Sequence, residues 1–133
     1  MLQPPAKTWI EVSASALRAN VAAAARIADP AQVIPVVKAN AYGHGLALVV
    51  RALAEERVPF FAVDSVEEAR VIRDASPQSP VLLLGYIPQH QLEEVLESGW
   101  SFVCSKREML SWVMKRSTID RPAKIHLEIE TGL

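Results

Sequence analysis

The apolar residues of this 133-residue chain fall into short runs that recur at similar intervals. Five runs rich in β-branched, leucine or aromatic residues begin roughly 20–27 residues apart, and runs of this length and composition are typical of buried strands. Segments with the helical period of 3.6 residues fill the intervals. The pattern predicts a repeated β-α unit with these strands: VIPVV (33–37), FFAV (60–63), VLLL (81–84), SFVC (101–104) and KIHLEI (124–129).

The helical segments carry their own start and stop signals. Ser65 with Glu68, and Ser105 with Glu108, fit the capping box, in which each side chain satisfies a backbone N–H at the start of a helix. Helical spacing predicts an apolar stripe at Leu46, Val49, Val50 and Leu53. A further helix is predicted between Pro88 and Gly99, and an Ala-rich helix is predicted to start at Ser13 or Ser15. The segment TWIEV (8–12) is predicted to form an extra strand.

Strands that alternate with helices and are apolar throughout predict a parallel sheet covered by helices, either an open sheet or a barrel. The fifth run alternates apolar and polar residues, and a polar inward face favours the barrel. An eight-stranded β/α barrel takes roughly 250 residues. We therefore expect an α/β fold, namely a partial (β/α)8 barrel of about five β-α units. Residues 1–133 would form one incomplete domain of that barrel. The alternative is a shorter, open fold.

Composition narrows the possible partners. Half of the residues are apolar, 22% are charged and the formal net charge is -1, without a long basic run. This balance predicts no nucleic-acid or membrane partner. The N-terminus does not resemble a secretory signal, and no apolar run approaches the length of a membrane span, so we expect a soluble cytoplasmic protein.

Cysteine and histidine offer little chemistry of their own. Cys104 is the single cysteine, so no internal disulfide can form, and burial as a small apolar residue is its expected role. His44, His90 and His126 match no metal-ligand spacing, and we predict no metal site.

Lys38 is the residue whose position points to chemistry. It directly follows VIPVV, at the carboxyl end of the predicted strand, where β/α folds gather their reacting groups. Apolar walls would desolvate its amine and favour the neutral form, which can attack a carbonyl or act as a base. The alternative is an ordinary surface lysine whose stem covers apolar neighbours.

The turn after Lys38 suits a ligand. Gly43 and Gly45 let the backbone pass close to a bound molecule, and the helix beginning at Leu46 offers N–H groups to an anion. Tyr42 adds a hydroxyl that could reach a phosphate oxygen.

The segment KANAYGHG (38–45) resembles the signature of the alanine racemase family, in which the lysine carries pyridoxal 5'-phosphate. TWIEVSASALRAN upstream is similar to that family's opening segment, VLLLGY resembles its third strand region, and HLEIETGL resembles a segment usually reading H-L-K-x-D-T-G-M. The resemblance implies an isomerase that interconverts L- and D-alanine, with a barrel, a separate C-terminal β domain and a homodimeric assembly.

The resemblance also implies roles for particular residues. Lys38 would bind the cofactor and act as one of two acid/base groups, Tyr42 would hydrogen-bond the cofactor phosphate, and Val36 and Leu84 would line the ring pocket. The family's second base is a tyrosine of the C-terminal domain that reaches in from the partner subunit, and no residue here matches it. The chain by itself is therefore expected to be inactive.

Two positions depart from the family pattern. Glu128 stands where many relatives have a lysine that becomes carbamylated, and Glu130 stands where they have an aspartate. A glutamate could supply the negative charge without modification. The alternatives are a non-catalytic remnant that binds the cofactor or another chain, part of a racemase of broader specificity, and an unrelated open-sheet binder of small molecules.

Overall fold

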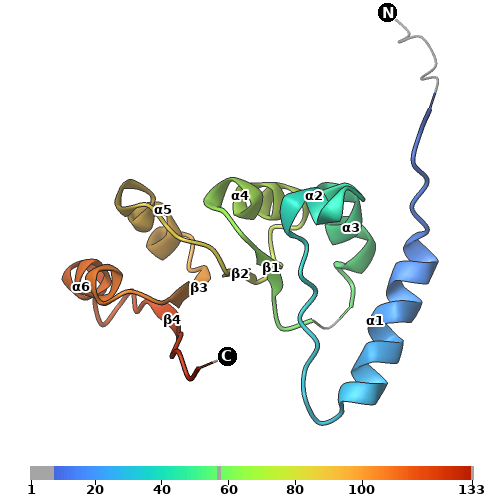
Figure 1. Ribbon diagram of the computed structural model, residues 1–133. Helices are drawn as coiled ribbons and strands as arrows, with labels where there is room; N and C mark the ends of the chain where they lie inside the picture. Colours follow the sequence, from blue (N-terminus) through green and yellow to red (C-terminus); the bar gives the residue numbers. More distant parts are fainter. Residues whose placement is uncertain (1–7, 57, 133) are drawn as a thin grey trace, which may run out of the picture.

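The computed structural model describes residues 8–56 and 58–132. Four strands alternate with helices and pair in parallel in the order β1-β2-β3-β4, which confirms the predicted α/β class (Figure 1). The strands are β1 (Phe61–Val63), β2 (Val81–Leu83), β3 (Ser101–Cys104) and β4 (Lys124–Leu127). The helices are α1 (Ala14–Ala28), α2 (Lys38–Tyr42), α3 (Leu46–Leu53), α4 (Val66–Ala75), η1 (Gln89–Gln91), α5 (Leu92–Glu97) and α6 (Arg107–Arg116).

The first predicted strand, 33–37, lies beside β1 without forming a regular ladder. A single parallel bridge joins Val36 to Ala62, supported by a bond from Val37 N to Ala62 O of 2.8 Å and one from Ala62 N to Pro35 O of 2.9 Å. Pro35 has no N–H to donate, which limits the pairing that this segment can make. The segment therefore takes the place of a neighbouring strand next to β1 but meets the criteria of a strand at only one position.

The hydrophobic core lies between the sheet and its helices. Figure 1 shows the helices in an arc along one side of the strands. Alternate strand residues point to this side, and Phe61, Val63, Leu83, Phe102 and Cys104 are each at most 1% exposed. The predicted burial of Cys104 is thereby confirmed. The helices contribute the other half of the core: Val50, Leu53, Ile72, Leu92, Val95, Met109 and Val113.

Several predicted helix signals are confirmed. Ser13 caps α1 by accepting a bond from Ala16 N, and Ser65 caps α4 by accepting one from Glu68 N. The reciprocal half of the predicted capping box does not form, because the Glu68 carboxylate accepts from Asp64 N and Asn40 N. The predicted stripe of α3 is buried in full, at 0–5% exposure. The predicted helix between Pro88 and Gly99 forms as η1 followed by α5.

Two predictions about helix and strand positions are wrong. The capping box at Ser105 does not form, because Lys106 is extended and α6 begins one residue later, at Arg107, without a side-chain cap. The segment 8–12 forms no strand. Trp9 and Ile10 are 73% and 78% exposed, and within the described ranges no strand lies alongside for this segment to pair with.

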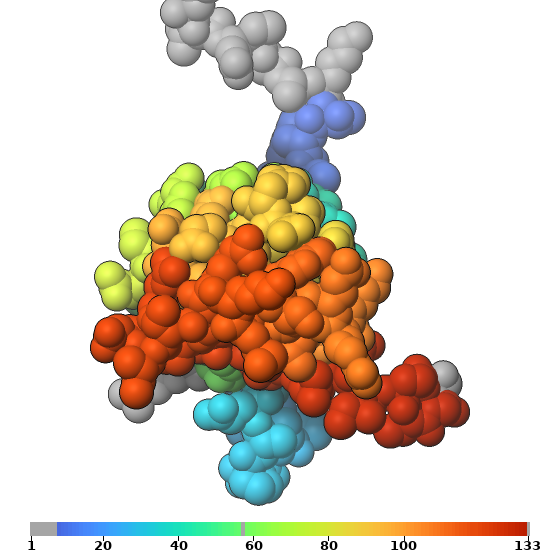
Figure 2. Space-filling model, turned by 90° about the vertical axis from the view of Figure 1, so that its left-hand side faces the viewer, coloured from blue at the N-terminus to red at the C-terminus, as the bar shows by residue number. Residues whose placement is uncertain are grey.

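Strand β4 is the far edge of the sheet. Its residues are exposed, including Leu127 at 62%, since only β3 pairs with it. Figure 2 shows α6 on this face of the molecule, with the segment after β4 extending away from the body. Over residues 8–56 and 58–132, no helix has the length and apolar character needed to cross a membrane.

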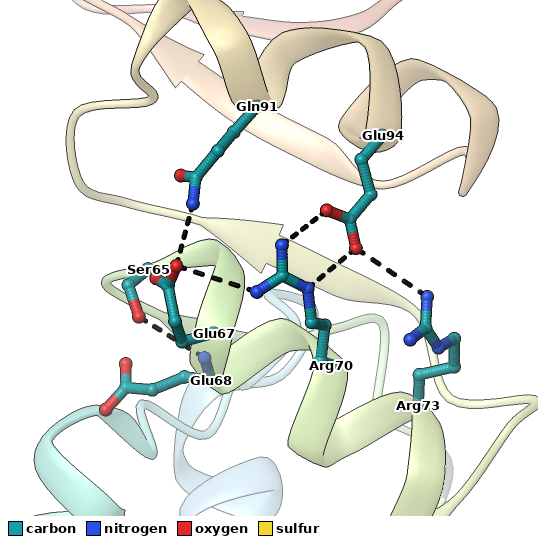
Figure 3. A network of polar contacts seen from close by, with 7 residues as sticks. All are labelled: Ser65, Glu67, Glu68, Arg70, Arg73, Gln91 and Glu94. Carbon is teal, nitrogen blue, oxygen red and sulfur yellow. Dashed lines mark hydrogen bonds and ion pairs between the residues drawn. The ribbon is translucent and has the colours of Figure 1, made fainter.

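A polar cluster joins α4 to α5 on the outer side of the helices (Figure 3). Arg70 donates two bonds to Glu94, from Nε to Oε1 at 2.8 Å and from Nη2 to Oε2 at 2.6 Å, and Gln91 donates to Glu67 at 2.7 Å. The hydrogen bonds from Arg70 hold the pKa of the Glu94 carboxyl below its usual value, and the same contact raises the pKa of Arg70. This bidentate pair fixes the two helices against each other.

Candidate functional site

The backbone that follows Lys38 winds in the left-handed sense. Ala39, Asn40, Ala41 and Tyr42 all have φ between 52° and 55°, a region that costs roughly 1–2 kcal/mol per residue for side chains other than glycine. Gly43 and Gly45, with φ of 91° and 93°, complete the turn at positions where glycine carries no such cost. A run of this kind persists only where the surroundings hold it in place.

Two side chains hold this turn by accepting hydrogen bonds from backbone N–H groups. Asn40 Oδ1 accepts from Leu46 N at 2.8 Å, so the first N–H of α3 is already paired and is not free for an anion, contrary to the sequence prediction. Glu68 accepts from Asn40 N at 3.4 Å through one oxygen and from Asp64 N at 3.0 Å through the other. The Glu68 carboxylate thus joins the turn to the loop between β1 and α4.

Lys38 lies at the carboxyl edge of the sheet, as predicted. Its Nζ is 3.4 Å from Oδ1 of Asp64, the residue that follows β1. The predicted apolar surroundings are not found, because the Lys38 side chain is 39% exposed and its nearest charged partner is a carboxylate. An exposed pair of this kind contributes about 0–1 kcal/mol to stability, so its main effect is to orient the amine.

Three of the four predicted site residues line two hollows, and Leu84 lines neither. Lys38, Asp64 and Glu68 line one of about 310 Å³. Tyr42 and Val36 line another of about 240 Å³, which lies against α1 and is mostly apolar. Tyr42 is 61% exposed and Val36 is 42% exposed. The structure therefore brings Tyr42 and Val36 together and places Lys38 on the other side of the turn.

Leu84 and Glu128 lie at the same edge of the sheet. Leu84 follows β2 and its N–H donates to Val63 O at 2.8 Å. The next residue, Gly85, packs so closely on the Asp64 backbone that a Cβ there would lie 2.2 Å from Asp64 O. Glu128 follows β4, and its N–H donates to Cys104 O at 3.1 Å. The carboxyl edge of the sheet thus carries Lys38, Asp64, Leu84 and Glu128.

Sequence reasoning missed Asp64, Asn40 and Glu68. Asp64 directly follows the apolar run FFAV, so the rule that singled out Lys38 after VIPVV would also have found Asp64. Glu68 was recognised only as a capping residue, and its bond to Asn40 joins segments 28 residues apart. No local signal predicts that contact.

Comparison with known proteins decides the family. Residues 12–133 match the family described as "Alanine racemase, N-terminal domain". The chain belongs to the alanine racemase N-terminal domain family. Within it, the chain is 36% identical over 126 residues to an alanine racemase of Carboxydothermus hydrogenoformans, and 38% identical over 131 residues to alanine racemase 2 of Caldanaerobacter subterraneus.

Solved structures of racemases share the fold. The biosynthetic alanine racemase of Pseudomonas aeruginosa matches 90% of the chain with a TM-score of 0.80 and 33% identity. The alanine racemase of E. faecalis matches 92% with a TM-score of 0.81 and 26% identity. The chain spans about a third of the length of these proteins, 33% and 34% respectively, and likewise 34% and 33% of the two relatives above. The predicted likeness to the N-terminal barrel part of the family is confirmed.

Proposed function

We propose that this chain is the N-terminal part of a pyridoxal-5'-phosphate-dependent alanine racemase, which interconverts L- and D-alanine and supplies D-alanine for peptidoglycan. Residues 1–133 would form the incomplete barrel domain, and the full-length protein would be a cytoplasmic homodimer. One observation carries the proposal: an accessible amine, that of Lys38, lies at the carboxyl edge of the strands in a chain that matches the family over residues 12–133.

The residues present fit a cofactor that has an aldehyde and a phosphate. The Lys38 amine is reachable from a hollow of about 310 Å³. The carboxylates of Asp64 and Glu68 gather on that side, so a phosphate is favoured on the other side of the turn, where Tyr42 exposes its hydroxyl and Val36 adds an apolar wall. Leu84 would complete the apolar surface from the end of β2.

Each residue then has a defined task. When bound, pyridoxal phosphate withdraws electrons from the α-carbon of the amino acid. Lys38 Nζ would hold the cofactor and carry the α-proton of D-alanine, and Asp64 would orient that amine through the 3.4 Å contact. Glu68 would hold the left-handed turn at a fixed position relative to the Asp64 backbone by accepting hydrogen bonds from Asn40 N and Asp64 N.

Racemisation needs a second acid/base group on the opposite side of the substrate. The chain has two tyrosines, Tyr42 and Tyr86. Tyr86 is 59% exposed, and its ring lies 5.2 Å from Lys106 Nζ, in the loop after β2. We assign neither tyrosine to this task, so full activity would depend on further polypeptide.

Reductive labelling tests the assignment. The chain is incubated with pyridoxal phosphate, treated with sodium borohydride and mapped by peptide mass spectrometry, and interconversion of L- and D-alanine is assayed in parallel. We expect the label on Lys38 and its loss in Lys38→Ala. Lys115→Ala is the matched control, since Lys115 lies in the last turn of α6.

The outcomes separate the possibilities. A label on Lys38 together with racemisation supports the proposal in full. A label on Lys38 without racemisation supports the cofactor site and favours the binding remnant for the chain alone. A label elsewhere, or no label, rejects Lys38 as the cofactor lysine.

A further inference from the structure

A cavity of about 520 Å³ lies at the opposite edge of the sheet from Lys38. Phe60, Val81, Ser101 and Lys124 line it, and each stands at or directly before the start of a strand. Asp64 follows the carboxyl end of β1, and Lys38 Nζ lies 3.4 Å from its carboxylate. The cavity is therefore a separate site that the proposed racemase chemistry does not use.

The charge of this cavity is positive. Arg73 and Lys124 line it, and its described lining residues include no aspartate or glutamate. The Arg73 guanidinium lies 5.7 Å from the centre of the Trp100 ring, and Lys124 Nζ lies 3.8 Å from the place that a Cβ on Gly99 would occupy. Both cations thus gather around the start of β3.

The two cations differ in their ion pairing. Arg73 forms ion pairs with Asp74 at 3.7 Å and with Glu94 at 3.9 Å, and neither of these carboxylate residues lines the cavity. Figure 3 shows the contact with Glu94. Lys124 forms no ion pair within residues 8–56 and 58–132. Basic side chains that line a concave site without acidic residues in its lining attract anions from solution.

A hydroxyl that opens onto the cavity is a second feature of the site. Ser101 is only 4% exposed and lines the cavity, directly opposite Lys124 in the β3–β4 ladder. Its hydroxyl takes part in none of the side-chain hydrogen bonds of the described residues. It is open to the cavity and not sealed from solvent, because no fully buried side-chain nitrogen or oxygen in that part of the chain lacks a partner. An oxygen of a bound ligand would accept a hydrogen bond from this hydroxyl.

We propose that this cavity binds a small organic phosphate, with the phosphate group held by Arg73, Lys124 and Ser101. The remaining walls include Pro59, Phe60 and Pro80, which suit an apolar or aromatic remainder. The cavity volume lies in the range of about 300–1,000 Å³ usual for small-molecule sites. Arginine and lysine together are typical phosphate ligands.

Calorimetric titration of the full chain with phenyl phosphate tests the site, with inorganic phosphate and phenol as partial probes. We expect saturable binding of phenyl phosphate, weaker binding of inorganic phosphate and still weaker binding of phenol. Lys124→Gln and Arg73→Gln should each weaken phenyl phosphate about 10-fold or more, the loss of one charge-assisted bond, and Ser101→Ala should weaken it by a smaller factor. Lys115→Gln controls for total charge.

Other results overturn the proposal. Absence of saturable binding, or affinities of Lys124→Gln and Arg73→Gln within twofold of the parent chain, rejects the site. Loss of binding in Lys38→Ala with retention in Lys124→Gln places the probe at the opposite edge and also rejects it. Equal affinity for inorganic and phenyl phosphate rejects the role of the apolar walls. Circular dichroism of each variant verifies that the fold is kept.

Discussion

Gly85→Ala is the substitution whose effect follows most directly from the geometry of the site. A Cβ at this position would lie 2.2 Å from Asp64 O and 3.0 Å from Asp64 Cγ, where ordinary contacts are 3.4–4 Å. The obstacle at 2.2 Å is a backbone atom, which cannot turn aside as a flexible side chain would. The ends of β1 and β2 would have to separate by roughly 1 Å.

The cost can be worked from the contacts at this point. Overpacking of a rigid site costs about 1–3 kcal/mol. The adjacent bond from Leu84 N to Val63 O, 2.8 Å long, would be stretched, and its loss adds about 1 kcal/mol. We expect Gly85→Ala to lower the free energy of unfolding by about 2–4 kcal/mol, or the melting temperature by roughly 8–16 °C for a chain of this size.

Urea denaturation followed by circular dichroism measures this loss, and Gly43→Ala is the matched control. Nothing lies within 4 Å of a Cβ at Gly43, so that variant bears only the cost of its positive φ, about 1 kcal/mol. Because Asp64 orients Lys38, Gly85→Ala should also reduce reductive labelling of Lys38 more than Gly43→Ala does. A loss of stability in Gly85→Ala no larger than in the control would refute the steric reasoning.

Three further predictions concern stability. Phe102→Ala should cost about 3–5 kcal/mol, since Phe102 is fully buried between sheet and helices, and a urea midpoint close to that of the parent chain would contradict this placement. Ser65→Ala should cost about 1 kcal/mol through the lost cap of α4, whereas Ser105→Ala, which removes no cap, should leave the urea midpoint almost unchanged. The hydrogen bonds from Arg70 lower the pKa of Glu94 in the folded chain, so on acidification the unfolded chain binds more protons than the folded chain does, and stability should fall as the pH drops through that lowered pKa. Urea midpoints measured between neutral and acidic pH should fall less steeply in Arg70→Gln than in the parent chain. Equal slopes would reject this linkage.

The fold class could be read from the chain because its signals are local. The stripe of α3 and the Ser65 cap depend on residues three or four positions apart, and each predicted run from 60 onward became a parallel strand. The two wrong predictions depended on more than the residues of the predicted element. The segment 8–12 needed a strand beside it, and Ser105 needed Lys106 in a helical conformation.

For the candidate site, the sequence by itself determined which amine stands at the carboxyl end of a strand and which family the chain resembles. Only the tertiary structure decided that Lys38 lies beside Asp64 and that Glu68 holds the left-handed turn. It also placed Tyr42 and Lys38 on different sides of that turn. Residue type and spacing set local hydrogen bonds and helix or strand periodicity, whereas contacts between segments more than 20 residues apart arise only when the strands pair and the helices pack on them.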